Sequence, residues 1–263
     1  MRIIVTVKQV PDPDIPPSHF NVDEAAKRVI PPNGVAPVMN GYDANALEAA
    51  LRLKEQQDGE VVVVSLGAAE ARDSLKRAIA MGASSAVLLS DPAFEHLDSL
   101  ATARVLAAGI KKIGDFDLVL SGRQASDTDA GQVHLGLAEL LGLPAVSPIQ
   151  ALEAADGGFI VQRIIEDGHQ IVQVPKPCLL VVSSEIGEPR YPPLRGIMAA
   201  GRAQIPVWTA GDIGLDAEQL RPARELHRLY VESRESQVEM VEAETPEEAG
   251  AMLALKLREA KLI

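Results

Sequence analysis

The chain has few aromatic residues, a single cysteine and fewer basic than acidic residues. Each of these features excludes some classes of structure or function. Aromatic residues make up only 3% of its 263 residues, so any core must be aliphatic. The lone Cys178 excludes an intramolecular disulfide and provides no cysteine cluster for a metal. The net charge of −12 argues against a nucleic-acid or anionic-membrane surface, because both require a basic field.

Long apolar runs are also missing. Nothing approaches the length of a membrane span, and the apolar start at residues 2–8 is too short for a signal peptide. Cys178 lies inside the apolar run 177–181, which predicts a buried thiol in a reducing compartment. We therefore expect a cytoplasmic protein with no direct membrane insertion.

The apolar pattern predicts the fold class. Short Val-, Ile- and Leu-rich runs of buried-strand type alternate with helical patterns up to residue 141. That alternation predicts an α/β protein with a doubly wound, mostly parallel sheet. The texture then changes: residues 145–174 read as an antiparallel hairpin region, and the apolar run 178–183 as a strand that returns to the sheet.

The stretch Asp117–Leu141 combines a strand, a polar loop and a helix. An apolar run ends at Ser121-Gly122, and helical spacing starts from Ala130. Ligands bind at such a point in a parallel sheet, because free N–H groups and the helix dipole meet there. Gly122 and Gly131 would admit a phosphate, and Ser126 and Thr128 could donate hydrogen bonds to it.

A plain structural interpretation of this loop stands beside the ligand site. Asp127 or Asp129 could be the N-cap of the helix, with the loop a simple connection. The loop matches neither G-x-x-x-x-G-K-[ST] nor G-x-G-x-x-G. Two aspartates would also repel a phosphate unless they face away or hold a cation. The spacing alone leaves both interpretations open.

The C-terminal part carries no further crossover units. Residues 185–206 form a Pro-rich segment whose Leu194 and Met198 either pack locally or present a docking surface. From about residue 211 we expect an arm that ends in a helix starting at Thr245-Pro246. Because such a helix cannot bury its own apolar face, we expect it to contact another chain. The predicted organisation is a nucleotide-binding α/β domain at 1–210, then the arm at 211–263.

Several segments in order along the whole chain are similar to a known family. They are Val7-Lys8, Met39-Asn40, the run 78–83, the run 122–127 with Gln132, Arg163 followed by 166–168, and the run 188–191. In this order they resemble the beta subunit of electron transfer flavoprotein, whose fold is an adenine-nucleotide-binding relative of the Rossmann type.

The resemblance implies two cofactor sites. A larger alpha subunit would carry most of an FAD site, with the Pro11–Pro13 loop and Tyr42 lying beside that FAD. A second adenine nucleotide would be AMP, or a second FAD in an electron-bifurcating form, with Asn40 able to contact adenine or ribose. The matching positions for this nucleotide are Thr6, Lys8, Asn40, Leu66, Leu120, Gly122, Arg123, Gln124, Ala125, Ser126, Asp127, Thr128, Asp129, Ala130, Gly131 and Gln132.

The resemblance also implies a partner surface. The segment 185–206 matches the family's recognition loop for acyl-CoA-type or other flavin dehydrogenases, with Leu194 as anchor supported by Ile197 and Met198. The chain departs from the pattern at Ile164, where an acidic residue is usual, and at Pro13, which replaces an aromatic residue. Basic residues are also few after the anchor, where Arg202 stands alone beyond Arg195.

Two functions remain in competition at this stage. One is an electron carrier subunit without its own acid–base catalysis, consistent with five scattered histidines and no catalytic triad. Among these, His134 is expected at the surface. The alternative is a stand-alone adenine-nucleotide-binding stress or sensor module, and the long arm argues against it. An ATP-using ligase would need a Gly/Ser loop that the Pro11–Pro17 stretch does not supply.

Overall fold

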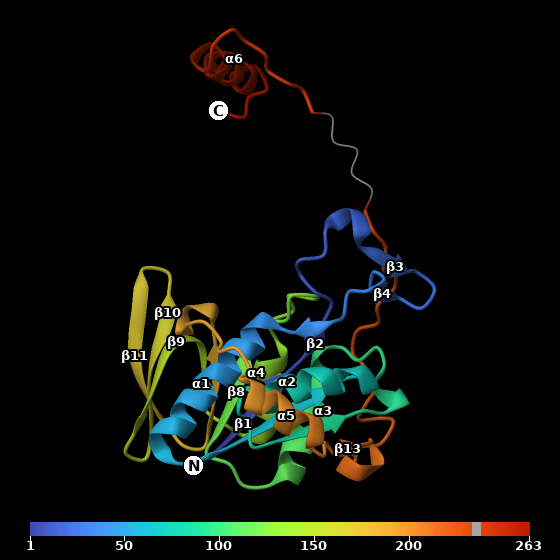
Figure 1. The fold of residues 1–263 in the computed structure, drawn as a ribbon, viewed down its shortest axis with the longest axis vertical. Helices are drawn as coiled ribbons and strands as arrows, with labels where there is room; N and C mark the ends of the chain where they lie inside the picture. Colours follow the sequence, from blue (N-terminus) through green and yellow to red (C-terminus); the bar gives the residue numbers. More distant parts are fainter. Residues whose placement is uncertain (233–237) are drawn as a thin grey trace. The chain divides into compact units, whose positions relative to one another are not determined.

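The computed structural model describes residues 1–232 and 238–263 and divides them into two units (Figure 1). The first is Met1–Leu229 and the second is Tyr230–Ile263. The first unit therefore extends past residue 210, where the sequence predicts the arm to begin. Residues 233–237 of that predicted arm lie outside the described part of the chain.

A nine-stranded sheet forms the centre of the first unit. Its order is β11-β10-β9-β12-β8-β1-β6-β7-β13, and all pairs from β9 to β13 are parallel, whereas β9, β10 and β11 pair antiparallel. The strands are β1 (Arg2–Val7), β6 (Glu60–Leu66), β7 (Ser85–Leu89), β8 (Leu118–Gly122), β9 (Ala145–Ala155), β10 (Gly158–Ile165), β11 (Gly168–Pro175), β12 (Cys178–Val182) and β13 (Val207–Trp208).

Helices cover both faces of this sheet, which explains the continuously apolar central strands. Residues of α1 (Gly41–Gln57) and α2 (Arg72–Met81) belong to the core cluster on one face. Residues of α3 (Ser99–Ile113) and α4 (Val133–Leu141) belong to the cluster on the other. The predicted doubly wound, mostly parallel sheet is confirmed. Cys178 is fully buried in the first cluster, as expected, and burial raises the pKa of its thiol to about 12.

The antiparallel hairpin region predicted at residues 145–174 is confirmed. The strands β9, β10 and β11, yellow in Figure 1, continue the main sheet, because β9 also pairs parallel with β12. The strand predicted at 178–183 returns to the sheet between β9 and β8, as expected.

Short elements fill the connections. They are β2 (Gln9–Val10), β3 (Asn21–Asp23), β4 (Arg28–Ile30), β5 (Val38–Met39), and the 3₁₀ turns η1 (Pro17–His19), η2 (Ala69–Ala71), η3 (Pro92–Phe94), η4 (Ser184–Ile186) and η5 (Gly211–Ile213). Strands β2 and β5 pair with each other and bring Lys8 close to Asn40, whose N–H donates to the Lys8 carbonyl at 2.9 Å.

The strand order places a topological switch point between β1 and β8. These strands are neighbours in parallel register, yet β1 leads into α1 on one face and β8 leads into α4 on the other. Connections that leave to opposite faces open a crevice at the carboxyl ends of the two strands. The predicted nucleotide loop at 123–132 follows β8 directly and therefore lies at this point.

Part of the predicted recognition loop is a helix. Helix α5 (Leu194–Arg202) packs against α2, and the two lie side by side in Figure 1. A Cβ on Gly196 would lie 2.0 Å from the Ala80 carbonyl oxygen, so the contact requires glycine. In the second unit, α6 (Pro246–Glu259) starts as predicted, with the Thr245 side chain accepting from the Glu248 N–H.

Candidate functional site

The loop after β8 is held against the start of α1 by Asn40. The Nδ2 of Asn40 donates to the Gln124 carbonyl at 2.8 Å, and its Oδ1 accepts from the Ser126 N–H at 3.2 Å. Asn40 is itself fully buried, so its amide is fixed. The amide that the sequence suggests for contacting adenine or ribose is thus used to shape the loop.

Lys8 and Gln124 engage the two loop aspartates. The Nζ of Lys8 lies 2.7 Å from both carboxylate oxygens of Asp127, and Gln124 Nε2 donates to Asp129 Oδ1 at 2.9 Å. Each negative charge therefore has a donor of its own, and the Lys8 ammonium offsets one of them. This removes much of the repulsion that two aspartates would exert on a phosphate.

Gly122 has a different role from the one that the sequence suggests. A Cβ at this position would lie 2.4 Å from Asp43 Oδ1 and 2.7 Å from the Tyr42 carbonyl carbon. Glycine is therefore required so that the first turn of α1 can approach the end of β8. Gly131, with φ +58°, allows the left-handed turn just before α4.

Helix α4 begins three residues later than the sequence pattern suggests. It starts at Val133 with Gln132 as N-cap, and no side chain caps it. The hypothesis that Asp127 or Asp129 is the N-cap is therefore wrong. Because the first N–H groups of a helix have no intrahelical partner, the uncapped start of α4 offers donors to an anion.

The remaining candidate residues differ in how they could contribute. Thr6 donates from Oγ1 to Ser121 Oγ at 3.0 Å, which joins the ends of β1 and β8. The Leu120 side chain is fully buried in the core, so any ligand contact by Leu120 would involve its backbone. Leu66 is half-buried at the end of β6.

Tyr42 and Arg123 form a pair at the edge of this site. The Arg123 guanidinium lies 5.4 Å from the centre of the Tyr42 ring, and the Arg123 N–H donates to the Val182 carbonyl at 3.1 Å. The ring and the guanidinium are flat groups on which a flavin or adenine could stack. Tyr42 is the residue that the sequence resemblance implies beside FAD.

His134 is buried, not exposed as the sequence analysis expects. It is 5% exposed in the first turn of α4, and burial lowers the pKa of its imidazole. The helical spacing of Val133, Leu137 and Leu141 defines the inner face, and His134 follows it by one position, which the apolar pattern does not reveal.

Asp43 is a site residue that sequence reasoning missed. Its carboxylate is 6% exposed and accepts from the Lys8 N–H at 2.8 Å. Burial raises the pKa of Asp43 to about 7, against the opposing effect of hydrogen bonds from Lys8, Asn40 and Gly122. The signal was an aspartate at the start of a helix, which is usually an exposed capping residue.

The segment before α5 is fixed to α1 by a cluster that the sequence did not reveal. The Arg190 Nε lies 2.8 Å from Glu48 Oε2, and Arg190 also pairs with Glu55. Arg52 bonds Glu48 and the carbonyls of Ile186 and Glu188. Burial alone would raise the pKa of Glu48, but the hydrogen bonds from Arg190 and Arg52 outweigh it and hold this pKa low.

The three candidate docking residues point outward from α5. The exposed fractions of Leu194, Ile197 and Met198 are 75%, 53% and 59%. Gly196 and the buried Ala200 lie on the inner side of the same helix, where Gly196 contacts Ala80 of α2. The structure thus brings the three side chains together on one exposed surface, which we call the α5 surface.

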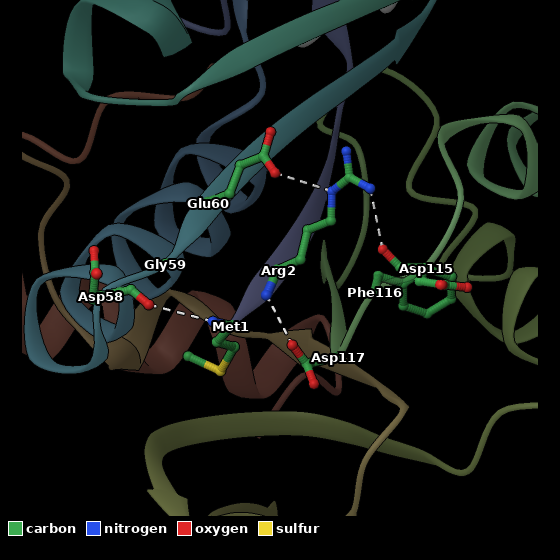
Figure 2. A pocket seen from close by; sticks show the side chains of 8 residues that line it. All are labelled: Met1, Arg2, Asp58, Gly59, Glu60, Asp115, Phe116 and Asp117. Atoms are coloured by element: carbon green, nitrogen blue, oxygen red, sulfur yellow. Dashed lines mark hydrogen bonds and ion pairs between the residues drawn. The ribbon is translucent and has the colours of Figure 1, made fainter.

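One depression lies at the amino ends of the parallel strands, at the opposite end of the sheet from the candidate loop. It has a volume of about 640 Å³ and surrounds the amino ends of β1, β6 and β8 (Figure 2). Arg2 lies at its centre, bonded to Asp117, Glu60 and the Asp115 carbonyl. A smaller one of about 190 Å³ lies between α1 and β9. Neither contains a residue of the candidate nucleotide site.

The fold and the polar switch point together define a Rossmann-like, doubly wound α/β protein. A family model described as "Electron transfer flavoprotein domain" matches residues 29–213. Since the match covers more than half of the chain, the chain belongs to the electron transfer flavoprotein family, and its relatives place it among the beta subunits.

Three relatives illustrate this membership. The chain is 39% identical to the caffeyl-CoA reductase-Etf complex subunit CarD of Acetobacterium woodii, over 100% of both chains. It is 39% identical to an electron transfer flavoprotein subunit beta of Thermoanaerobacterium thermosaccharolyticum, over 84% of this chain and 83% of that one. It is 38% identical to protein FixA of Azorhizobium caulinodans, over 82% and 78%.

The family resolves the main alternative left by the sequence. The resemblance to an electron transfer flavoprotein beta subunit is confirmed, and the stand-alone stress or sensor module is set aside. Membership makes the chain an electron-transfer subunit of a flavoprotein. Within the part of the chain that the structure describes, no helix is long and apolar enough to cross a membrane.

Proposed function

We propose that the chain shares an FAD with a larger alpha subunit and passes electrons between flavin dehydrogenases and an acceptor. Family membership and similarity to proteins named as beta subunits support the pairing. The Tyr42–Arg123 pair, with the Pro11–Pro13 loop, is the surface we assign to that FAD. The bound flavin would supply the redox chemistry, while Tyr42 and Arg123 would orient it.

The crevice between β1 and β8 is the site we assign to a second adenine nucleotide. The observation that carries this assignment is the convergence of Lys8, Asn40 and the loop 123–132 at the switch point. Loop N–H groups and the uncapped start of α4 are suited to an anionic phosphate, and Lys8 supplies a positive charge. No acid–base group is required there, which is consistent with an electron carrier and not an independent enzyme.

The nucleotide is AMP in our first assignment. A second FAD, in an electron-bifurcating form, is the other candidate, and one observation favours it specifically. The relative that matches over the full length of both chains carries the name of a caffeyl-CoA reductase–Etf complex subunit. If the chain works in such a complex, it takes part in a flavin-based oxidoreductase reaction.

The test is co-expression with a tagged alpha subunit, followed by extraction of the bound cofactors. We expect one FAD and one AMP per heterodimer, quantified by absorbance and chromatography of the extract. Two flavins per heterodimer would mean that the second nucleotide is FAD and not AMP. A complex holding one FAD and no further adenine nucleotide would refute the crevice as a nucleotide site.

A further inference from the structure

A buried carboxylate joins the ends of two neighbouring strands beneath the candidate nucleotide loop. Asp43 Oδ2 accepts from the Lys8 N–H at 2.8 Å, and the Gly122 N–H also donates to this carboxylate. Lys8 follows β1 directly, and Gly122 is the last residue of β8. Asp43 therefore fixes both strand ends to the first turn of α1.

Two residues that bond to Asp43, Lys8 and Asn40, also bond to the loop 123–132. Lys8 extends its Nζ to Asp127 at 2.7 Å. Asn40, whose side chain also bonds to Asp43, is held by the loop backbone at Gln124 and Ser126. The hydrogen bonds thus connect Asp43 to the loop in two steps. Asp43 bonds to Lys8 and Asn40, and these two residues bond to the loop.

Burying the Asp43 carboxylate costs desolvation free energy, and the atoms around it restrict its position. Gly122 provides the space for it, since a Cβ there would lie 2.4 Å from Asp43 Oδ1. An ionised carboxylate inside a fold is disfavoured unless donors compensate it, and here the donors are mainly backbone N–H groups. An uncharged side chain could join the same elements with a smaller desolvation penalty. A charged group at this point therefore indicates a role beyond packing.

We propose that Asp43 is the positioning residue of the nucleotide loop: its carboxylate aligns Lys8 and Asn40, which hold residues 123–132 in the shape that binds a phosphate. This proposal rests on the nucleotide site described above. Asp43 itself contacts no ligand and acts through these two residues.

The ionised form of Asp43 is the one that can accept from both strand ends. A protonated carboxyl group has one acceptor position fewer. It also carries an O–H donor, which would face the N–H donors that bond to the ionised form. The charged groups facing this region are Lys8 at the end of β1, and Asp127 and Arg123 in the loop. Protonation removes a buried charge and so favours the folded state as a whole, but within the folded state it takes an acceptor away from Lys8 and Gly122. Local order of the loop is therefore expected to fall as Asp43 takes up its proton near neutral pH.

The first test measures AMP binding to the heterodimer after removal of its nucleotide. At pH 8, Asp43→Asn is expected to bind AMP about tenfold more weakly than the unaltered chain, as for loss of a charged hydrogen bond. At pH 6 the two should differ by less than about threefold, since the carboxyl group of the unaltered chain is then largely neutral. Comparing both proteins at each pH cancels the ionisation of the phosphate.

A matched control is Asp98→Asn. Asp98, at the start of α3, accepts from the Ala101 N–H and from the Ala223 and Arg224 N–H groups, and none of these hydrogen bonds involves the loop 123–132. This variant is expected to lower stability and leave AMP affinity unchanged. If Asp43→Asn binds AMP as tightly as the unaltered chain at pH 8, or if Asp98→Asn weakens AMP equally, the proposal is overturned.

A second measurement needs neither the variant nor a nucleotide. Amide hydrogen-exchange protection of residues 123–132 in the unaltered heterodimer should fall from pH 8 to pH 6, after correction for intrinsic rates, while protection at Ala101 stays constant. Constant loop protection would overturn the positioning role. If loop protection responds but AMP and FAD both fail to bind the emptied site, the nucleotide site is wrong and the role of Asp43 in ordering the loop stands.

Discussion

At the scale of single residues, the site is shaped by side chains whose donors and acceptors are already used within the protein. Asn40 is committed to the loop backbone, Asp127 to Lys8 and Asp129 to Gln124. A ligand would therefore meet the loop backbone and the start of α4 more than these side chains. Such preorganisation reduces the ordering cost of binding.

The buried Asp43 makes stability depend on pH with a defined sign. Its pKa is raised from 3.8 to about 7, so between these values the folded state binds more protons than the unfolded state. Its contribution is fully present below pH 3.8 and is lost as pH rises to about 7, at most about 4 kcal/mol. In Asp43→Asn, the loss of unfolding free energy between pH 4.5 and 7.5 should shrink by more than half, measured by urea denaturation. An unchanged pH slope would contradict this assignment.

At the scale of elements, α5 depends on one close helix contact and one ionic cluster. Gly196 lets α5 approach the carbonyl of Ala80, and the Glu48–Arg190 cluster fixes the segment that leads into it. The first contact lies on the inner side of α5, and the second holds the segment before α5 against α1. Neither contact uses Leu194, Ile197 or Met198, so the α5 surface stays exposed.

Gly196→Ala tests the helix contact. The added Cβ would lie 2.0 Å from the Ala80 carbonyl oxygen, so α5 must shift, which is expected to cost about 1–3 kcal/mol of unfolding free energy. The matched control is Gly201→Ala on the same helix, where nothing lies within 4 Å of the new Cβ. That change should be neutral or stabilising by about 0.5–1 kcal/mol. Equal thermal shifts for both variants would argue against the close packing.

Leu194→Ala tests the α5 surface as a docking site. Removal of an anchor that is 75% exposed should leave the fold and the FAD content intact. The rate of electron transfer from a cognate dehydrogenase at limiting concentration should fall about tenfold, in the range of an interface hot spot. The control is Leu100→Ala, a 41% exposed leucine on α3 at the other face of the sheet. Unchanged kinetics for Leu194→Ala would count against docking at α5.

At the scale of the whole molecule, the chain has one sheet-based unit and a second unit with little of its own to bury. Met252 and Leu253 of α6 are both exposed within the described residues. A single amphipathic helix gains most of its stability from packing against another surface. The alpha subunit is the partner we propose for this unit.

Leu253→Asp tests that partnership. A charge on the predicted contact side of α6 should lower co-purification with a tagged alpha subunit at least about tenfold, while residues 1–229 unfold at an unchanged temperature. The control, Ala251→Asp, adds the same charge to the opposite side of the same helix. If both variants co-purify normally, α6 is not part of the interface.

The amino-acid sequence by itself determined the doubly wound sheet, the polar loop after β8 and the start of α6, because these depend on local periodicity, turn residues and caps. Only the tertiary structure determined which contacts Asp43, Gly122 and Arg190 make. Their partners lie 35, 79 and 142 positions away, at Lys8, at Asp43 and at Glu48. A sequence pattern records which side of a strand or helix is apolar, but the energy of a buried carboxylate or of a close backbone contact depends on which distant segment the fold brings to it.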